Sequence, residues 1–243
     1  MPKLHVLFKK EELDPGRLQD KIVIVLDVLF ATSTIVHAFN QGIRCIWPAR
    51  NAKDALRIAA GLVAPGQEPP LLAGEYLAAG LPGFGPPTPL ALGTTQVAGA
   101  TLVYATTNGT VALNNAADAA QVYVGALLNG AALVAHVADR HPDTDVLVVC
   151  AGSMGRFNLE DFYGAGHIAS HFEKTGGYLL SDAAMAALLF CRGCDADTAL
   201  GASRVGKMMQ EHQLQHEIDY VANKDTMQVI PQLSNGCLQL AAA

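Results

Sequence analysis

A carboxylate and three hydroxyls follow the first strongly apolar run of the chain. The run Ile22–Leu26 ends at Asp27, and Thr32, Ser33 and Thr34 stand at the start of a helical pattern. Ligands of open α/β sheets bind beyond the carboxyl ends of strands, so we predict that Asp27 is a catalytic or metal-binding carboxylate. The hydroxyls and the free N–H groups of the helix start suit an anion. The alternative is that these side chains only cap the helix.

A second polar turn, with the sequence ATTNGT, follows the apolar run Thr101–Ala105. Its Asn-Gly pair supplies a turn with positive φ, and hydroxyls with neighbouring backbone N–H groups can bind an anion. We therefore predict that this turn contributes to the site through Thr106, Thr107, Asn108, Gly109 and Thr110. The alternative is an ordinary strand-to-helix turn, in which Asn-Gly is common.

The third polar segment joins a glycine-rich loop to two adjacent acids. After the apolar run Val146–Cys150, the sequence CAGSMGRFNLED leads to Glu160 and Asp161 at a helix start. Adjacent helical side chains point about 100° apart, so one acid can bind a metal while the other caps or orients a neighbour. Ser153 and Arg156 in the loop are candidate substrate contacts. The alternative is a pair of acids that merely complements the helix dipole.

Glu75 adds a carboxylate after a fourth apolar run, Leu71–Ala73. Four strand ends with hydroxyls, amides and carboxylates predict one polar pocket for a small-molecule substrate. Histidines are a weaker signal. His167 and His171 are spaced i, i+4, but a zinc site needs further ligands that the sequence does not identify, so we interpret them as core or surface residues.

The elements that must position these residues alternate between buried strands and helices. The predicted strands are Leu4–Phe8, Ile22–Val28, Cys45–Trp47, Leu71–Ala73, Thr101–Ala105, Gln121–Val124 and Val146–Cys150. The predicted helices are Ser33–Asn40, Ala52–Ala60, Thr110–Asn115, Gly130–Arg140 and Leu159–Lys174. This alternation predicts an α/β fold, a three-layer α/β/α sandwich with a mostly parallel or mixed sheet.

The Pro- and Gly-rich segment Gly80–Pro89 interrupts the alternation. It is either a surface loop beside the site, such as a lid, or a linker between lobes. We therefore predict a single domain over residues 1–243, or two lobes with a boundary near residues 80–100.

The composition narrows the class of protein. The 243 residues are 51% hydrophobic and carry a formal net charge of −6, without a basic stripe, which predicts no nucleic-acid partner. Since no apolar run approaches about 18 residues, we predict no membrane span. Five cysteines without a disulfide pattern indicate a cytoplasmic location, and we interpret the pair Cys191 and Cys194 as helix packing. The Ala-rich, weakly charged composition favours a homo-oligomer, most simply a dimer.

Four ordered motifs resemble those of the 2-phosphosulfolactate phosphatases: DVLFATST, AGE followed by a PGF loop, TTNGTVAL and CAGSMGRFNLEDFYGAG. The stretch HEIDYVANKDTMQVIP also resembles an Asp-bearing segment of that family, and the similarity covers nearly the whole chain. The resemblance implies an α/β, magnesium-dependent enzyme that releases phosphate from a small sulfonated phosphoester. It implies that the catalytic candidates are Asp27, Glu75, Asn108, Glu160 and Asp161, with the Mg²⁺ ligands drawn from Asp27, Glu160 and Asp161.

The chain departs from that family's pattern at three positions where the family usually carries Arg. Phe30, Tyr76 and Val111 stand there instead, and the loop GFGPPTP lacks the family's usual Asp and Asn at Gly85 and Thr88. These changes remove positive charge, and we expect Phe30, Tyr76 and Val111 to line a more apolar pocket. Arg156 is a nearby cation that could partly substitute. The alternatives to a phosphatase are hydrolase or lyase chemistry on a less anionic, more apolar molecule, and a non-catalytic binding relative.

Overall fold

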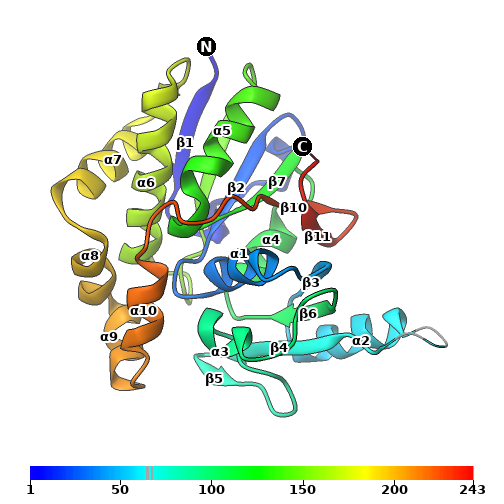
Figure 1. The fold of residues 1–243 in the computed structure, drawn as a ribbon. Helices are drawn as coiled ribbons and strands as arrows, with labels where there is room; N and C mark the ends of the chain where they lie inside the picture. Colours follow the sequence, from blue (N-terminus) through cyan, green and yellow to red (C-terminus); the bar gives the residue numbers. More distant parts are fainter. Residues whose placement is uncertain (64–65, 67, 243) are drawn as a thin grey trace.

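The computed structural model describes residues 1–63, 66 and 68–242. Within these residues the chain forms a mixed sheet of eleven strands, with ten α-helices around it (Figure 1). The strands are β1 (Lys3–Leu7), β2 (Ile22–Leu26), β3 (Cys45–Ala49), β4 (Leu71–Tyr76), β5 (Ala79–Gly80), β6 (Thr101–Ala105), β7 (Gln121–Gly125), β8 (Val146–Cys150), β9 (Leu179–Leu180), β10 (Pro231–Ser234) and β11 (Cys237–Leu240). The helices are α1 (Ala31–Asn40), α2 (Ala52–Leu62), α3 (Pro89–Gly93), α4 (Gly109–Asn115), α5 (Gly130–Arg140), α6 (Leu159–Thr175), α7 (Asp182–Gly193), α8 (Ala196–Ala202), α9 (Arg204–Glu211) and α10 (Gln215–Val221).

The sheet consists of two groups of parallel strands joined by a hairpin. Its strand order is β5-β4-β6-β3-β11-β10-β7-β2-β8-β1-β9. Strands β4, β6 and β3 are parallel to one another, as are β7, β2, β8, β1 and β9. The hairpin β10–β11 is antiparallel to β3 on one side and to β7 on the other. The two groups therefore run in opposite directions.

Helices cover both faces of the sheet, which confirms the predicted α/β/α sandwich with a mixed sheet. On one face, Ile35 of α1 and Leu113 of α4 share a buried cluster with strand residues such as Val23 and Leu102. On the other face, α5, α6 and α7 cover β1, β2, β7 and β8, while α2 contributes Ala55 to a cluster with β3 and β6. Strands covered in this way are apolar on both sides, and β2 is buried throughout its length.

The core around α1 belongs to both groups of strands. Val124 of β7, Ile46 of β3 and Tyr104 of β6 lie in the same buried cluster as α1, and Figure 1 shows α1 between the two groups. Because the twisted sheet bends around this helix, the carboxyl ends of β2 and β6 meet although the strands run in opposite directions. Gly109, which follows β6, consequently packs against Asp27, which follows β2.

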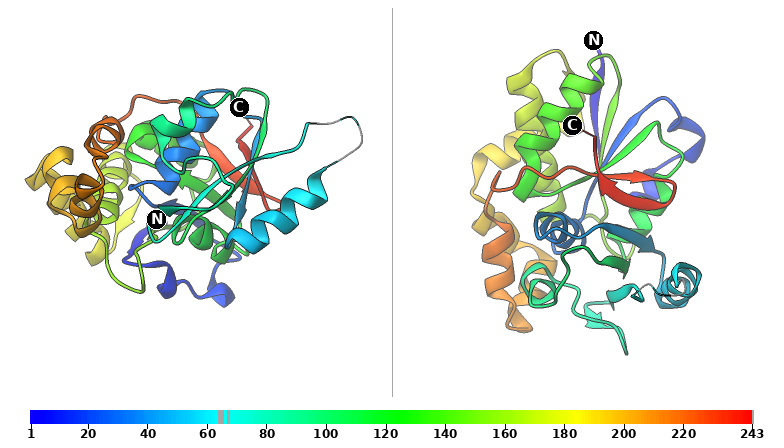
Figure 2. Two further views of the ribbon diagram at one scale, coloured as in Figure 1. Left: turned by 90° about the horizontal axis from the view of Figure 1, so that it is seen from below. Right: turned by 45° about the vertical axis from the view of Figure 1, so that its right-hand side comes forward.

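The predicted strands and helices are confirmed, with ends that differ from the observed ones by at most three residues. The last predicted helix ends at Lys174. Beyond it the structure contains further elements that were not predicted, among them α7–α10 and the hairpin β10–β11. Figure 2 shows α8–α10 at one end of the molecule and α2 at the other. Cys191 and Cys194 are half-buried beside the α8–α10 core, consistent with the packing interpretation. In the segment Gly80–Pro89, the N–H of Gly85 donates to the carbonyl of Leu72 at 2.7 Å, which holds the loop against β4.

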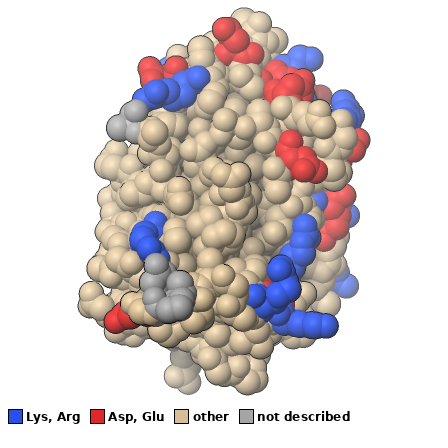
Figure 3. Space-filling model, turned by 90° about the vertical axis from the view of Figure 1, so that its right-hand side faces the viewer, with Lys and Arg blue, Asp and Glu red and all other residues tan. Residues whose placement is uncertain are grey.

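The surface carries few charges on one face. Figure 3 shows a broad area of uncharged residues, with most of the Lys, Arg, Asp and Glu side chains near its edge. An uncharged face of this kind would suit contact between subunits. The homo-oligomer stays a prediction. Among the described residues, no helix combines the length and the apolar character needed to cross a membrane.

Candidate active site

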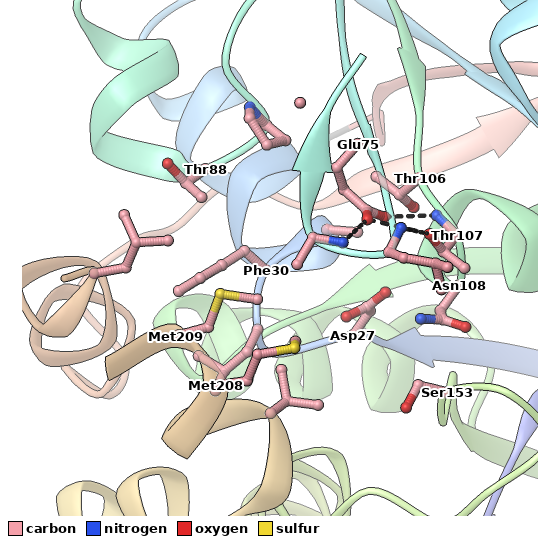
Figure 4. Close-up of a pocket in the computed structure, with 18 of the residues that line it drawn as sticks. Asp27, Phe30, Glu75, Thr88, Thr106, Thr107, Asn108, Ser153, Met208 and Met209 are labelled. Atoms are coloured by element: carbon pink, nitrogen blue, oxygen red, sulfur yellow. Dashed lines mark hydrogen bonds between the residues drawn. The ribbon is translucent and has the colours of Figure 1, made fainter. Parts of the chain in front are cut away.

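Polar residues from the ends of four strands surround a cavity of about 470 Å³ (Figure 4). The predicted site residues that line it are Asp27 and Phe30 after β2, Glu75 in β4, Thr106, Thr107 and Asn108 after β6, and Ser153 after β8. The structure therefore brings the four predicted polar segments together. Helix α9 and the residues around it form the wall that the sequence did not predict, with Arg204, Val205, Met208, Met209 and Leu214.

Asp27 is buried but reaches the cavity. Its backbone N–H donates to Thr32 Oγ1 at 2.9 Å, and that hydroxyl donates to the Asp27 carbonyl at 3.0 Å, which fixes the turn between β2 and α1. Gly109 allows the two strand ends to approach, because a Cβ there would lie 2.7 Å from Asp27 Oδ2 and 2.5 Å from the Ala31 Cβ. The glycine at this position is therefore required by packing against the carboxylate.

The carboxyl group of Asp27 has an unusual pKa. Burial is the main cause that raises this pKa to about 7, and the negative charges of Glu75 and Glu160 add to the rise. The Gly109 N–H and the Lys10 ammonium act in the opposite direction. Asp27 therefore keeps its proton to a higher pH than a free carboxyl group does, and a cation beside it would favour the carboxylate form.

Glu75 ties the β4–β5 turn to the turn after β6. Its carboxylate accepts hydrogen bonds from the Thr107 N–H at 2.6 Å, the Thr107 hydroxyl at 3.1 Å and the Ala78 N–H at 2.7 Å (Figure 4). The Thr107 hydroxyl in turn accepts from the Leu77 N–H at 2.9 Å. The backbone N–H of Thr107 is therefore already bonded to a carboxylate, and Glu75 positions this turn beside the cavity.

Glu160 and Asp161, at the start of α6, have different partners, as their adjacency predicts. Asp161 accepts from the Val28 N–H at 2.9 Å and from the Gly152 N–H at 3.0 Å, which joins the ends of β2 and β8. Glu160 is also buried, and its Oε2 has no hydrogen-bond partner among the described residues. Burial raises the pKa of both carboxyl groups. Asp161 thus organises the backbone, whereas Glu160 retains a free buried oxygen.

Lys10 is a cation of this site that the sequence analysis missed. Its buried ammonium donates to Asn108 Oδ1 at 3.0 Å and to the Ala151 carbonyl at 3.2 Å, so it bridges the residues that follow β6 and β8. It also lowers the pKa of Asp27. In the sequence, Lys10 stands in the run FKKEE without a motif, so only the folded chain reveals its position.

Arg204 is the second cation that the sequence analysis missed. It lines the cavity, contacts the Ser153 hydroxyl and donates to Asn158 Oδ1 at 3.2 Å. It begins α9, which Ser203 caps by accepting from the Gly206 N–H at 2.8 Å. That cap before an amphipathic helix was the available signal in the sequence.

The remaining wall of the cavity is apolar. Figure 4 shows Phe30, Met208 and Met209 on one side, and on the other side Asp27, Glu75, Thr106, Thr107, Asn108 and Ser153. Phe30 and Met209 are buried, and Leu214 and Leu77 extend the apolar lining. Methionine side chains adapt their shape to irregular apolar groups, so this wall suits an apolar part of a ligand.

Several predicted substrate contacts lie outside the lining of the cavity. The hydroxyls of Thr32, Ser33 and Thr34 are fully buried and donate to the carbonyls of Asp27, Val28 and Phe30. Because α1 lies in the core, its hydroxyls must find backbone partners, and they position the turn rather than contact a ligand. Likewise the Thr110 hydroxyl donates to the Thr106 carbonyl at 3.0 Å. Gly109 and Val111 are not part of the lining either, and Tyr76 and Arg156 have exposed side chains.

The sequence of this chain is similar to a family of known proteins. The family model described as 2-phosphosulpholactate phosphatase matches residues 7–236. The chain belongs to the 2-phosphosulfolactate phosphatase family. A protein of Deinococcus radiodurans named probable 2-phosphosulfolactate phosphatase is 34% identical over 227 residues, which cover 93% of this chain and 92% of the relative. Proteins with the same name from Clostridium novyi (strain NT) and Clostridium tetani are 28% and 29% identical, and the matches cover 95% and 97% of this chain and 96% and 99% of theirs.

Membership in the 2-phosphosulfolactate phosphatase family confirms the resemblance found in the sequence. It also confirms the predicted enzyme class, a phosphatase that hydrolyses phosphoric monoesters. Of the catalytic candidates that the resemblance implied, Asp27, Glu75 and Asn108 line the cavity, whereas Glu160 and Asp161 are buried outside its lining. Magnesium dependence, the dimer and the cytoplasmic location stay predictions.

Proposed function

We propose that this chain is a magnesium-dependent phosphatase that releases phosphate from a small phosphoester whose remaining part is largely uncharged. The observation that carries the proposal is Asp27, a buried carboxylate that opens onto the cavity beside Glu75 and Asn108. Two cations, Lys10 and Arg204, lie on the same polar side. A site that combines buried carboxylates with cations can hold both a metal ion and an anionic phosphoryl group.

The donor set fits Mg²⁺. Glu160 has a buried oxygen without a partner in the described part of the chain, and its charge and that of Glu75 raise the pKa of Asp27. A divalent cation would relieve the repulsion between these groups. Asp27 and Glu160 would hold the ion, and Asp161 would keep the strand ends in place. Mg²⁺ keeps several waters and needs only one or two protein carboxylates. When bound, it would neutralise charge on the phosphoryl oxygens.

The phosphoryl group would lie between Asn108, Ser153 and Arg204. Arg204 already contacts the Ser153 hydroxyl, so its guanidinium stands where an anion could be bound. Lys10 holds the Asn108 side chain and adds positive charge behind it. Lys10 and Arg204 would attract the phosphoryl group, the role that the sequence suggested for Arg156. Charge-assisted hydrogen bonds are about twice as strong as neutral ones.

The apolar wall supports a substrate that differs from the one in the relatives' name. A sulfonate placed among Phe30, Met208 and Met209 would lose its hydration without gaining a partner, which is unfavourable. An ester whose second group is an alkyl or aryl moiety would bury that group there. The same wall also supports the second candidate, hydrolase or lyase chemistry on an apolar molecule without a phosphate.

Phosphate release from a panel of phosphomonoesters tests the proposal. The panel includes phosphosulfolactate, phospholactate, and alkyl and aryl phosphates, each assayed with Mg²⁺ and with EDTA. We expect Mg²⁺-dependent release that Asp27→Asn abolishes and that the exposed-site control Asp118→Asn leaves unchanged. Higher kcat/KM for the alkyl and aryl esters would support the substrate class. The phosphatase proposal fails if the folded wild-type protein releases no phosphate from the panel, or if Asp27→Asn retains full activity.

A further inference from the structure

Two histidines and an aspartate form a cluster that is not part of the lining of the active-site cavity. His167 and His171 lie one turn apart on α6, and Asp225 lies in the segment that links α10 to β10. His167 Nε2 is 3.0 Å from Asp225 Oδ1, and His171 Nε2 is 3.1 Å from Asp225 Oδ2. The i, i+4 spacing of the histidines is visible in the sequence, but Asp225, 58 positions beyond His167, is brought to them only by the fold.

The separation of these atoms fits a tetrahedral metal ion. One ligand atom from each of the three side chains lies within 4.8 Å of the other two. Ligands about 2.0–2.1 Å from a tetrahedral zinc ion lie roughly 3.3 Å from one another. The two observed nitrogen–oxygen distances are within a few tenths of an ångström of that value. An ion bound here would take the place of the two hydrogen bonds that the imidazole nitrogens make to Asp225.

The surroundings leave space and access beside His167, His171 and Asp225. Gly130 leaves space beside them, because a Cβ there would lie 2.8 Å from His167 Nε2 and 3.3 Å from Asp225 Oδ1. Asp225 is partly exposed, so water can fill a remaining coordination position.

We propose that His167, His171 and Asp225 form a second metal site, which binds a divalent transition-metal ion of the zinc type. Imidazole nitrogens favour such ions over Mg²⁺, whereas the all-oxygen carboxylate group at the cavity favours Mg²⁺. Asp225 also accepts from the Ala131 N–H at 2.8 Å, so a bound ion would link α5, α6 and the segment after α10. The role of the ion would be structural, because Asp225 belongs to the segment that connects α10, beside the cavity wall, to the hairpin β10–β11.

Titration of the metal-free protein with zinc chloride, followed by calorimetry, tests the site. We expect one ion to bind per chain, with at least tenfold weaker binding in His171→Gln. The matched control is His136→Gln, because His136 and His141 also form a histidine pair, both within reach of the Tyr123 hydroxyl and with no carboxylate bonded to them among the described residues. Asp27→Asn must leave this binding unchanged, since its carboxylate belongs to the other site.

X-ray absorption of the zinc-loaded wild-type protein provides a test that does not depend on any variant's folding. Two imidazole ligands and one carboxylate in the zinc coordination shell would support the proposal. A shell made only of oxygen ligands would overturn it. Equal zinc affinity in His171→Gln and the wild type, or zinc binding that only Asp27→Asn abolishes, would overturn it as well.

Discussion

Replacing Asp27 by asparagine should stabilise the metal-free protein above neutral pH. Folding raises the pKa of this carboxyl group from its usual 3.8 to about 7. Between these two pH values the folded state holds a proton that the unfolded state has released, so stability falls as the pH rises through this window. Each pKa unit corresponds to about 1.4 kcal/mol, so the full penalty above pH 7 is on the order of 4 kcal/mol.

Asparagine carries no charge at any of these pH values and keeps one oxygen that can accept from the Gly109 N–H. In EDTA, we expect Asp27→Asn to exceed the wild type in free energy of unfolding by up to about 4 kcal/mol at pH 8, and to show no advantage at pH 4. Urea denaturation followed by circular dichroism between pH 4 and 8 measures the difference. Adding Mg²⁺ should stabilise the wild type and leave the variant nearly unchanged.

Asp145→Asn is the control with the opposite sign. The Lys3 N–H is the main cause that lowers the pKa of Asp145, with the Lys21 ammonium adding to it. The ionised Asp145 carboxylate stabilises the fold above its usual pKa, and this contribution is lost in acid. Asp145→Asn should therefore have a lower free energy of unfolding than the wild type at pH 8 and the same value in strong acid. A gap between Asp27→Asn and the wild type that is the same at pH 4 and pH 8 would refute the reasoning about Asp27.

Two further predictions concern packing around the cavity. Gly109→Ala forces a methyl group against Asp27, so we expect a loss of about 1–3 kcal/mol in urea denaturation and a loss of phosphate release. In the control Gly61→Ala, in α2, the new Cβ has no neighbour outside its own helix within 4 Å in the described part of the chain, so this variant should gain up to about 1 kcal/mol. A similar response of both variants would contradict the packing argument. The fully buried Glu217 carboxylate accepts hydrogen bonds from N–H groups at the start of α3. Glu217→Gln replaces one accepting oxygen by an NH₂ group, which cannot accept, so we expect the free energy of unfolding to fall by about 1–3 kcal/mol. Unchanged urea midpoints in Glu217→Gln would show that these bonds contribute little.

The sequence by itself was enough to predict the local elements and the polar strand ends. Apolar runs such as Ile22–Leu26 and Val146–Cys150 can only be stable strands when both faces are covered, so the α/β class followed from them. Asp27, Glu75 and Asn108 were identifiable because each follows such a run, and ligands bind at that edge of a sheet. The family motifs at the same positions led to the same residues.

The position of the hairpin β10–β11 in the sheet could not be predicted from the sequence. Asn235 and Gly236 both have positive φ in its turn, and an Asn-Gly pair between apolar runs is a recognised hairpin signal. A hairpin signal does not say between which strands the hairpin is inserted. Its position between β3 and β7 reverses one half of the sheet, and that depends on contacts between residues far apart in the chain.

Only the tertiary structure decided which side chains face the cavity. Thr32 and Ser33 have the right chemistry for a ligand, but the burial of α1 commits their hydroxyls to backbone carbonyls. Lys10 and Met208 belong to no motif, and the cap before Arg204 marks only a helix start, yet the fold brings all three to the site from opposite ends of the chain. Local sequence sets which conformations a segment prefers, whereas the partner of each buried polar group is set by the packing of distant elements, because an unpaired group in the interior costs more than most local preferences.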